Sequence, residues 1–206
     1  MADSPRIGRT YNKHMADEVA HEKRALRAEL RERRRITPAH ERDAADAAIT
    51  QNLIDLTSGL GSRSLAAYLS LPDEPATRDF VAWACEQGIR VLLPISRADG
   101  LLDWAPYDGS GEELDAFGMP APTSELLSPL AINGVDLIIV PAASVDRTGM
   151  RMGWGRGYFD KTLGSMENSP PVYAVIFDHE LVDTVPSERH DQRVDGVVTP
   201  SGIVAF

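Results

Sequence analysis

The 206-residue chain contains a single cysteine, Cys85, and no apolar run as long as the roughly 18–20 residues of a membrane helix. One cysteine excludes an intrachain disulfide and a cysteine-rich zinc or iron–sulfur site. The first residues carry charges with no apolar stretch after them, which excludes a secretory signal. We therefore expect a cytoplasmic protein with no membrane partner.

The composition excludes a disordered chain, because 43% hydrophobic and 25% charged residues are typical of a globular domain. The net charge of −10 argues against a general nucleic-acid binder. The charge is unevenly spread, however. Residues 23–35 hold seven basic side chains against Glu29 and Glu32, a net charge of +5. This segment is either a solvated helix face or a binding site for an anion.

The polar residues 1–18 show no pattern, and we expect a flexible arm there before a single domain over residues 19–206. A helix is expected from near Asp17 to Arg35. Lys23, Arg27 and Arg31 recur every fourth residue and share one face of that helix. A second helix is expected to begin with Thr37 as its N-cap.

Apolar segments then alternate with helical ones. The expected strands are Ser64–Leu71, Val91–Ile95, Leu101–Pro106, Val135–Pro141, Val172–Phe177 and Val194–Val198, with a helix over Thr77–Gln87. This alternation predicts a three-layer α/β domain with a largely parallel sheet.

The segment after the strongest expected strand is rich in glycine, with Gly149, Gly153, Gly155 and Gly157 near Arg151, Arg156 and Lys161. Ligands of open α/β sheets bind beyond the carboxyl ends of the strands. Glycine lets backbone N–H groups approach an anion closely. We infer a loop that binds a phosphate chain, although the spacing matches neither common nucleotide fingerprint. A surface hairpin is the alternative.

The segment from Pro141 to Asp160, ending Gly-Trp-Gly-Arg-Gly-Tyr-Phe-Asp, resembles the signature of 5-formyltetrahydrofolate cyclo-ligases, also called 5,10-methenyltetrahydrofolate synthetases. Three other segments agree with that family in order. They are the basic helix that starts at Lys23, the segment Leu71–Thr77 and the segment Pro186–Asp195. The resemblance covers residues 20–200.

The resemblance implies an αβα sandwich of the type shared with sugar-phosphate isomerases and CoA transferases. It also implies an ATP-driven reaction in which 5-formyltetrahydrofolate becomes 5,10-methenyltetrahydrofolate, with release of ADP and phosphate. The formyl oxygen attacks the γ-phosphate, the 10-nitrogen attacks the phosphorylated imidate, and phosphate leaves. ATP is then a co-substrate and Mg²⁺ is the implied cofactor.

The basic helix and the glycine-rich loop are, by this resemblance, the ATP site. The implied ATP-binding residues are Lys23, Arg27, Arg151, Met152, Gly153, Trp154, Gly155, Arg156, Gly157, Tyr158 and Phe159. Arg151 and Arg156 are the implied catalytic residues, because phosphoryl transfer needs cations that balance developing charge.

The implied folate contacts are Leu71, Glu74, Trp154 and Tyr158, and the implied magnesium ligands are Asp160 and Asp191. Carboxylates near phosphates suit magnesium, and a carboxylate accepts hydrogen bonds from pterin N–H groups. Simpler interpretations remain beside these. Glu74 could cap a helix, Asp160 could face a helix dipole, and the two aromatic rings could belong to the core.

Two positions depart from the family pattern. Ala121 stands where a glutamate is frequent, and Glu180 stands where a glutamine is frequent, so no role is carried onto either. Arg31 and Arg33–Arg35 face either the anionic folate tail or solvent.

Two other functions fit parts of the sequence. One is an enzyme similar to sugar-phosphate isomerases, since fold does not fix function. The other is a nucleic-acid-binding protein that uses the helix over residues 23–35. The leading hypothesis has only ATP and 5-formyltetrahydrofolate as partners, and a monomer or weak dimer as the assembly.

Overall fold

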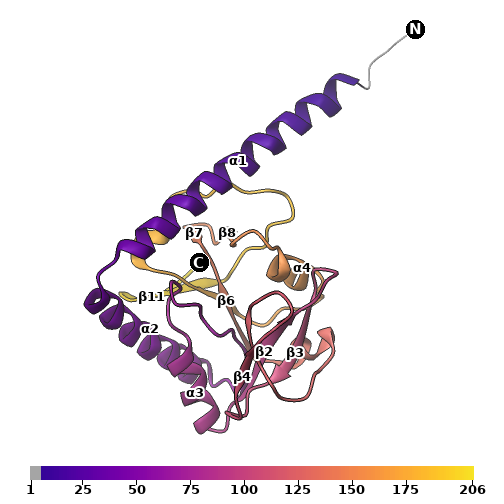
Figure 1. Cartoon of the computed structure of the whole chain (residues 1–206). Coiled ribbons are helices and arrows are strands. Elements are labelled where there is room, and N and C mark those ends of the chain that lie inside the picture. The colour runs from indigo at the N-terminus through magenta and orange to yellow at the C-terminus, as the bar shows by residue number, and fades with distance from the viewer. Residues whose placement is uncertain (1–5) are drawn as a thin grey trace.

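The computed structural model describes residues 6–206, apart from the side chains of residues 6–14 and Ala16. It begins with helix α1 (Arg6–Ile36), whose first part extends away from the body of the domain (Figure 1). The expected helix start near Asp17 is wrong, because residues 6–18 continue the helix instead of preceding it. No proline interrupts this stretch, so nothing in it breaks the helix. Residues 1–5 of the expected arm lie outside the described residues.

The junction between the first two helices differs from the expected capping. The Thr37 hydroxyl donates a hydrogen bond to the carbonyl oxygen of Arg33 (3.0 Å), so Thr37 closes the end of α1. Helix α2 (Ala39–Leu60) has Pro38 at its N-cap position. The expected N-cap role of Thr37 is therefore wrong, because its side chain has already found a partner in the preceding turn.

Within residues 6–206, seven strands form the central sheet. In spatial order they are β12 (Gly202–Ala205), β11 (Gly196–Thr199), β9 (Val172–Val175), β6 (Leu137–Pro141), β1 (Ser64–Ala66), β2 (Arg90–Ser96) and β3 (Leu102–Pro106). The five inner strands pair in parallel, and both edge strands pair antiparallel with their neighbours. The expectation of a largely parallel sheet is confirmed.

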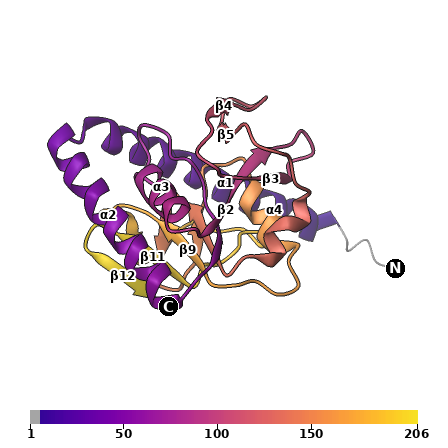
Figure 2. The same cartoon turned by 90° about the horizontal axis from the view of Figure 1, so that it is seen from below.

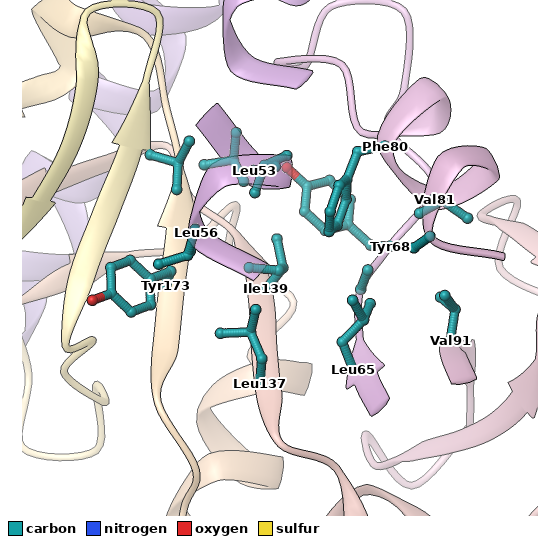
Figure 3. Close-up of a cluster of buried hydrophobic side chains, with 14 of the residues drawn as sticks. Leu53, Leu56, Leu65, Tyr68, Phe80, Val81, Val91, Leu137, Ile139 and Tyr173 are labelled. Atoms are coloured by element: carbon teal, nitrogen blue, oxygen red, sulfur yellow. The ribbon is translucent and has the colours of Figure 1, made fainter. Parts of the chain in front are cut away.

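Helices cover both faces of this sheet. On one face, Leu53 and Leu56 of α2 and Phe80 of α3 (Arg78–Glu86) pack over Leu137 and other sheet residues (Figure 3). Each fully buried side chain of this kind contributes about 1.5–3 kcal/mol. α2 and α3 lie side by side when the domain is seen from below (Figure 2). The other face packs against the 3₁₀-helix η1 (Pro129–Gly134) and helix α4 (Tyr158–Gly164). The expected three-layer α/β fold is confirmed.

Short elements extend the fold beyond the central sheet. They are the hairpin β4 (Glu112–Leu114) and β5 (Pro120–Pro122), the small sheet β10 (Leu181–Val182), β7 (Ser144–Asp146) and β8 (Arg151–Met152), and the 3₁₀-helix η2 (Asp178–Glu180). Leu30 of α1 packs on this small sheet through Met152 and Val185. The contact holds α1 across the end of the domain that carries the small sheet.

The segment after β1 leaves the sheet earlier than expected. β1 ends at Ala66, whereas a strand was expected as far as Leu71. The hydroxyl of Thr77 donates to the carbonyl oxygen of Tyr68 (2.5 Å) and accepts from the amide of Ser70 (3.2 Å), so side-chain hydrogen bonds replace the backbone hydrogen bonds of a strand.

Within residues 6–206, no helix is both long and apolar enough for a bilayer-spanning segment.

Candidate active site

A cavity of about 340 Å³ opens beside the residues that follow β1 and β6. β1 lies between β2, its neighbour toward one edge, and β6, its neighbour toward the other, so the strand order reverses there. Such a switch point is where open α/β sheets bind ligands. Side chains from α1, from the segment after β1, and from the glycine-rich loop together line the cavity.

Most of the predicted site residues surround this cavity. Those that line it are Leu71, Glu74, Arg151, Gly153, Trp154, Arg156, Gly157, Tyr158, Phe159 and Asp160. Those that do not line it are Lys23, Arg27, Met152, Gly155 and Asp191. Met152 is a buried core residue, Arg27 contacts Gly153 of the cavity wall, and Lys23 pairs with acidic residues that do not line the cavity.

The basic helix and the glycine-rich loop touch directly. Arg27 Nε donates a hydrogen bond to the carbonyl oxygen of Gly153 over 2.8 Å. A Cβ atom at Gly155 would lie 3.3 Å from the Arg27 guanidinium, and Gly155 has a φ of +102°. Glycine is therefore needed here both for the backbone conformation and for the close approach of the cation.

Lys23 is buried against two carboxylates. Its ammonium nitrogen lies 2.6 Å from Asp191 Oδ2 and 2.7 Å from Glu188 Oε2, and its side chain is only 4% exposed. The structure thus brings an implied phosphate ligand and an implied metal ligand together. Glu188 was missed, because no pattern in the sequence distinguishes it from other acidic residues.

Arg151 and Asp160 also meet each other. Arg151 Nη2 donates to Asp160 Oδ1 over 2.7 Å, and Nη1 donates to the carbonyl oxygen of Pro141 over 2.9 Å. The buried Nε of Arg151 has no partner among the described residues. The amide of Gln192 donates to the same Asp160 oxygen over 3.2 Å, so Asp160 adjoins the segment that carries Asp191.

Three side chains that could ligate a metal ion gather next to Lys23. Glu188, His190 and Asp191 place one ligand atom each within 4.8 Å of one another. Carboxylate oxygens suit magnesium, which is bound through one or two carboxylates together with phosphate oxygens and water. Glu188 and Asp191 therefore offer oxygens of the right chemistry for the implied ion, whereas Asp160 is outside this group and is paired with Arg151.

Arg156 also lines the cavity. It is exposed and donates from Nη1 to the carbonyl oxygen of Phe117 over 3.2 Å. The ring of Phe117 meets the ring of Tyr158 edge-on at 6.4 Å. Arg156 and Tyr158 therefore belong to a wall shared with the loop after β4.

The remaining α1 arginines divide between the cavity and the surface. Arg31 and Arg34 line the cavity and lie over the ring of Trp154, at 5.2 Å and 4.6 Å from its centroid. Arg35 forms an exposed ion pair with Glu32 one turn away. The buried position of Arg34 was not predicted, since neighbouring arginines in a basic run look alike in sequence.

The segment after β1 contributes the carboxyl of Glu74 and the hydroxyl of Tyr68 to the cavity wall. Glu74 Oε2 accepts a hydrogen bond from the amide of Leu71 (2.9 Å), and burial raises the pKa of Glu74 above its ordinary range.

Tyr68 is 5% exposed, and its hydroxyl has no partner among the described residues. Burial, followed by the charge of Glu74, raises the pKa of Tyr68 well above its ordinary range, so the group stays a neutral donor. Tyr68 and Leu69 both line the cavity and were missed because they lie within the strand expected over Ser64–Leu71, which ends at Ala66.

Known proteins share this sequence and this fold. The model of the 5-formyltetrahydrofolate cyclo-ligase family matches residues 19–200. A 5-formyltetrahydrofolate cyclo-ligase of Mycolicibacterium smegmatis is 35% identical over 190 residues, covering 89% of this chain and 97% of that protein. The mouse enzyme of the same name is 28% identical, covering 85% and 92%.

Two solved structures share the fold. The 5,10-methenyltetrahydrofolate synthetase of Aquifex aeolicus has a TM-score of 0.75 at 23% identity, covering 89% of this chain and 92% of that one. The synthetase of Mycoplasma pneumoniae has a TM-score of 0.68 at 18% identity, covering 87% and 99%. With the family match over nearly the whole described length, the chain belongs to the 5-formyltetrahydrofolate cyclo-ligase family.

Proposed function

We propose that this enzyme uses ATP to close 5-formyltetrahydrofolate into 5,10-methenyltetrahydrofolate, with release of ADP and phosphate. The observation that carries the proposal is the contact between Arg27 of the basic helix and Gly153 of the glycine-rich loop. The contact brings cations and exposed backbone amides to one edge of a single cavity. That arrangement supplies the electrostatic stabilisation that phosphoryl transfer needs.

The reaction requires the formyl oxygen and the γ-phosphate to meet in line. The oxygen attacks phosphorus, ADP leaves, and the 10-nitrogen then attacks the phosphorylated imidate carbon and expels phosphate. We assign the residues 151–159 to the ATP phosphates, with Arg151 and Arg156 as the catalytic cations. Leu71, Glu74, Trp154 and Tyr158 are assigned to the folate, since all four line the same cavity. A cavity that excludes water also protects the imidate from hydrolysis.

Two of the cations that we assign to the ATP phosphates are held in ion pairs that ATP would have to displace. Lys23 is held by Glu188 and Asp191, and Arg151 is held by Asp160. We assign Asp160 and Asp191 to Mg²⁺, which when bound supplies positive charge to the phosphate oxygens. Lys23 and Arg151 would then turn from these carboxylates to phosphate.

The inward placement of the cations argues for a small anion over a nucleic acid. Lys23 and Arg34 are buried in ion pairs, so the surface of α1 is less basic than its sequence. We accordingly propose small-molecule partners only, and a cytoplasmic enzyme that is a monomer or a weak dimer.

A single assay tests the proposal. The purified chain is mixed with 5-formyltetrahydrofolate, ATP and Mg²⁺, and the absorbance of the methenyl product is followed. Product formation that needs all three components is the expected result. Turnover of a sugar phosphate without ATP, or tight RNA binding that weakens with salt in place of product formation, would overturn it.

A further inference from the structure

Arg34 is locked in place by a buried carboxylate. Its Nε lies 2.7 Å from Glu180 Oε1 and its Nη2 lies 2.8 Å from Glu180 Oε2, a bidentate pair. Nη2 also donates to the carbonyl oxygen of Ala142 over 3.1 Å. The side chains are 2% and 0% exposed. A planar guanidinium that is held through Nε and Nη2 by one carboxylate has a fixed orientation.

The locked guanidinium lies over two aromatic rings. Its central carbon lies 4.6 Å from the centroid of the Trp154 ring and 5.4 Å from that of Phe177. Phe177 is itself tied to the lock, because its amide donates to Glu180 Oε2 over 2.9 Å. Arg31 adds a second cation over Trp154 at 5.2 Å. Cations over desolvated indole rings attract them.

Trp154 is a residue of the glycine-rich loop, between Gly153 and Gly155. Neither glycine has a side chain to pack, so the conformation of residues 153–155 depends on the contacts of Trp154 and of the backbone. From α1 the loop receives the Arg27 bond to Gly153, the cations of Arg31 and Arg34 over Trp154, and apolar packing of Trp154 against the cluster that contains Leu30. The stack therefore holds the loop from the side that faces α1.

Stability alone is a weak reason for such a pair. A buried ion pair pays a large desolvation cost, and apolar residues of similar volume are often equally stable in its place. What apolar residues cannot supply is a fixed cationic plane beneath the tryptophan.

We propose that Arg34 is a positioning residue for the phosphate-binding loop: fixed by Glu180, it stacks on Trp154 and holds residues 153–157 in the ATP-binding conformation. The inference deepens the proposed function and rests on it for the identity of the ligand. The effect of the Arg34 stack on the conformation of the loop can be measured without any ligand.

The decisive variant is the double substitution Arg34→Met with Glu180→Leu, which removes the stack and leaves no unpaired buried charge. Hydrogen exchange of the peptide over residues 151–159 is measured without ligand, and KM is measured for both substrates. We expect exchange in the loop to rise at least fivefold while exchange in the central sheet stays unchanged. KM for ATP should rise about tenfold. KM for 5-formyltetrahydrofolate should rise as well, because Trp154 is assigned to both ligands.

The chain offers a matched control on the same helix. Arg35 and Glu32 form a bidentate pair through Nε and Nη2, but both are exposed and no aromatic ring lies against them among the described residues. Arg35→Met with Glu32→Leu should leave loop exchange and both KM values unchanged.

The outcomes separate the two proposals. A folded Arg34→Met, Glu180→Leu protein with unchanged loop exchange and unchanged KM for ATP would overturn the positioning role. If this variant fails to fold, Trp154→Leu removes the ring while the ion pair stays, and the same loop must then exchange faster. A wild-type chain that makes no methenyl product refutes the proposed function, while loop exchange still tests the stack.

Discussion

Arg27 Nε and the carbonyl oxygen of Gly153 are joined by a 2.8 Å hydrogen bond across 126 positions of the chain. The bond satisfies only one of the five N–H donors of the guanidinium. Burial and the neighbouring charge of Arg31 lower the pKa of Arg27, whereas Asp191, Glu188 and Asp160 raise it in part. Positive charge is therefore crowded at the loop, and an anion bound there would relieve the crowding.

The first prediction concerns this cation. Arg27→Met keeps the apolar stem of the side chain and removes its charge, so KM for ATP should rise about thirtyfold, equivalent to a charge-assisted hydrogen bond of about 2 kcal/mol. The thermal midpoint should change little, because Arg27 has no ion-pair partner within 4 Å among the described residues. Initial-rate kinetics with varied ATP make the measurement, and Arg42→Met in α2, which does not line the cavity, is the control. An unchanged KM for ATP would contradict the role of Arg27.

Asp160 provides a prediction about the metal. Asp160→Asn removes the charge that a magnesium ligand needs, so the Mg²⁺ concentration at half-maximal rate should rise about tenfold. The exposed Asp183, whose side chain is 93% exposed, supplies the control variant Asp183→Asn. Identical magnesium titrations for the wild type and Asp160→Asn would remove Asp160 from the metal site.

Glu74 provides a prediction about substrate affinity. The neutral amide side chain introduced by Glu74→Gln cannot offer a charged acceptor to pterin N–H groups, so the dissociation constant for 5-formyltetrahydrofolate should rise about thirtyfold, or about 2 kcal/mol. KM for ATP should stay within a factor of about two. Fluorescence titration without ATP measures the folate affinity by itself, and equal affinity in both proteins would refute the assignment.

The same residue makes stability depend on pH. Burial raises the pKa of Glu74 above its ordinary value of 4.5, and the bond from Leu71 offsets this only in part. Because the folded protein binds this proton more tightly than the unfolded chain, its stability falls as pH rises from 4.5 to the folded pKa. Glu74→Gln should thus unfold at a higher temperature than the wild type near neutral pH. Thermal unfolding between about pH 4 and pH 8 should show the difference vanish at the acidic end.

Tyr68 separates binding from stability. Tyr68→Phe removes a hydroxyl that has no partner among the described residues, so the free energy of unfolding should stay the same or rise slightly. KM for 5-formyltetrahydrofolate should rise about fivefold if the hydroxyl serves the bound folate, a loss of about 1 kcal/mol. Tyr173→Phe in β9 is the control, since Tyr173 is buried but does not line the cavity. A clear loss of stability in Tyr68→Phe would mean that the hydroxyl has a partner in the fold.

The parts of the fold with strong local patterns were predictable from the sequence. The apolar run Leu137–Pro141 is buried on both faces, as a central parallel strand should be, and it forms β6. The two-residue strands β8 and β10 could not be predicted, because a strand that short has no periodicity. Polar segments also lack an apolar periodicity, which is why the sequence predicts an arm where the structure has the first part of α1.

The site was predictable only where a motif carried it. The glycine-rich loop and the basic helix stand out in sequence, and the structure places them in contact. The pair formed by Arg34 and Glu180 spans 146 positions and depends on which of several adjacent arginines faces inward. Neither the sequence separation nor the direction of an arginine side chain produces a local sequence pattern, so only the structure reveals this ion pair.

Lys23 meets Glu188 and Asp191 across 165 and 168 positions, so its counter-charges lie near the opposite end of the chain. During synthesis the cations of α1 leave the ribosome long before those carboxylates exist. The segment that carries Glu188 and Asp191 is therefore made late in synthesis, and only then does Lys23 gain the carboxylates that neutralise it.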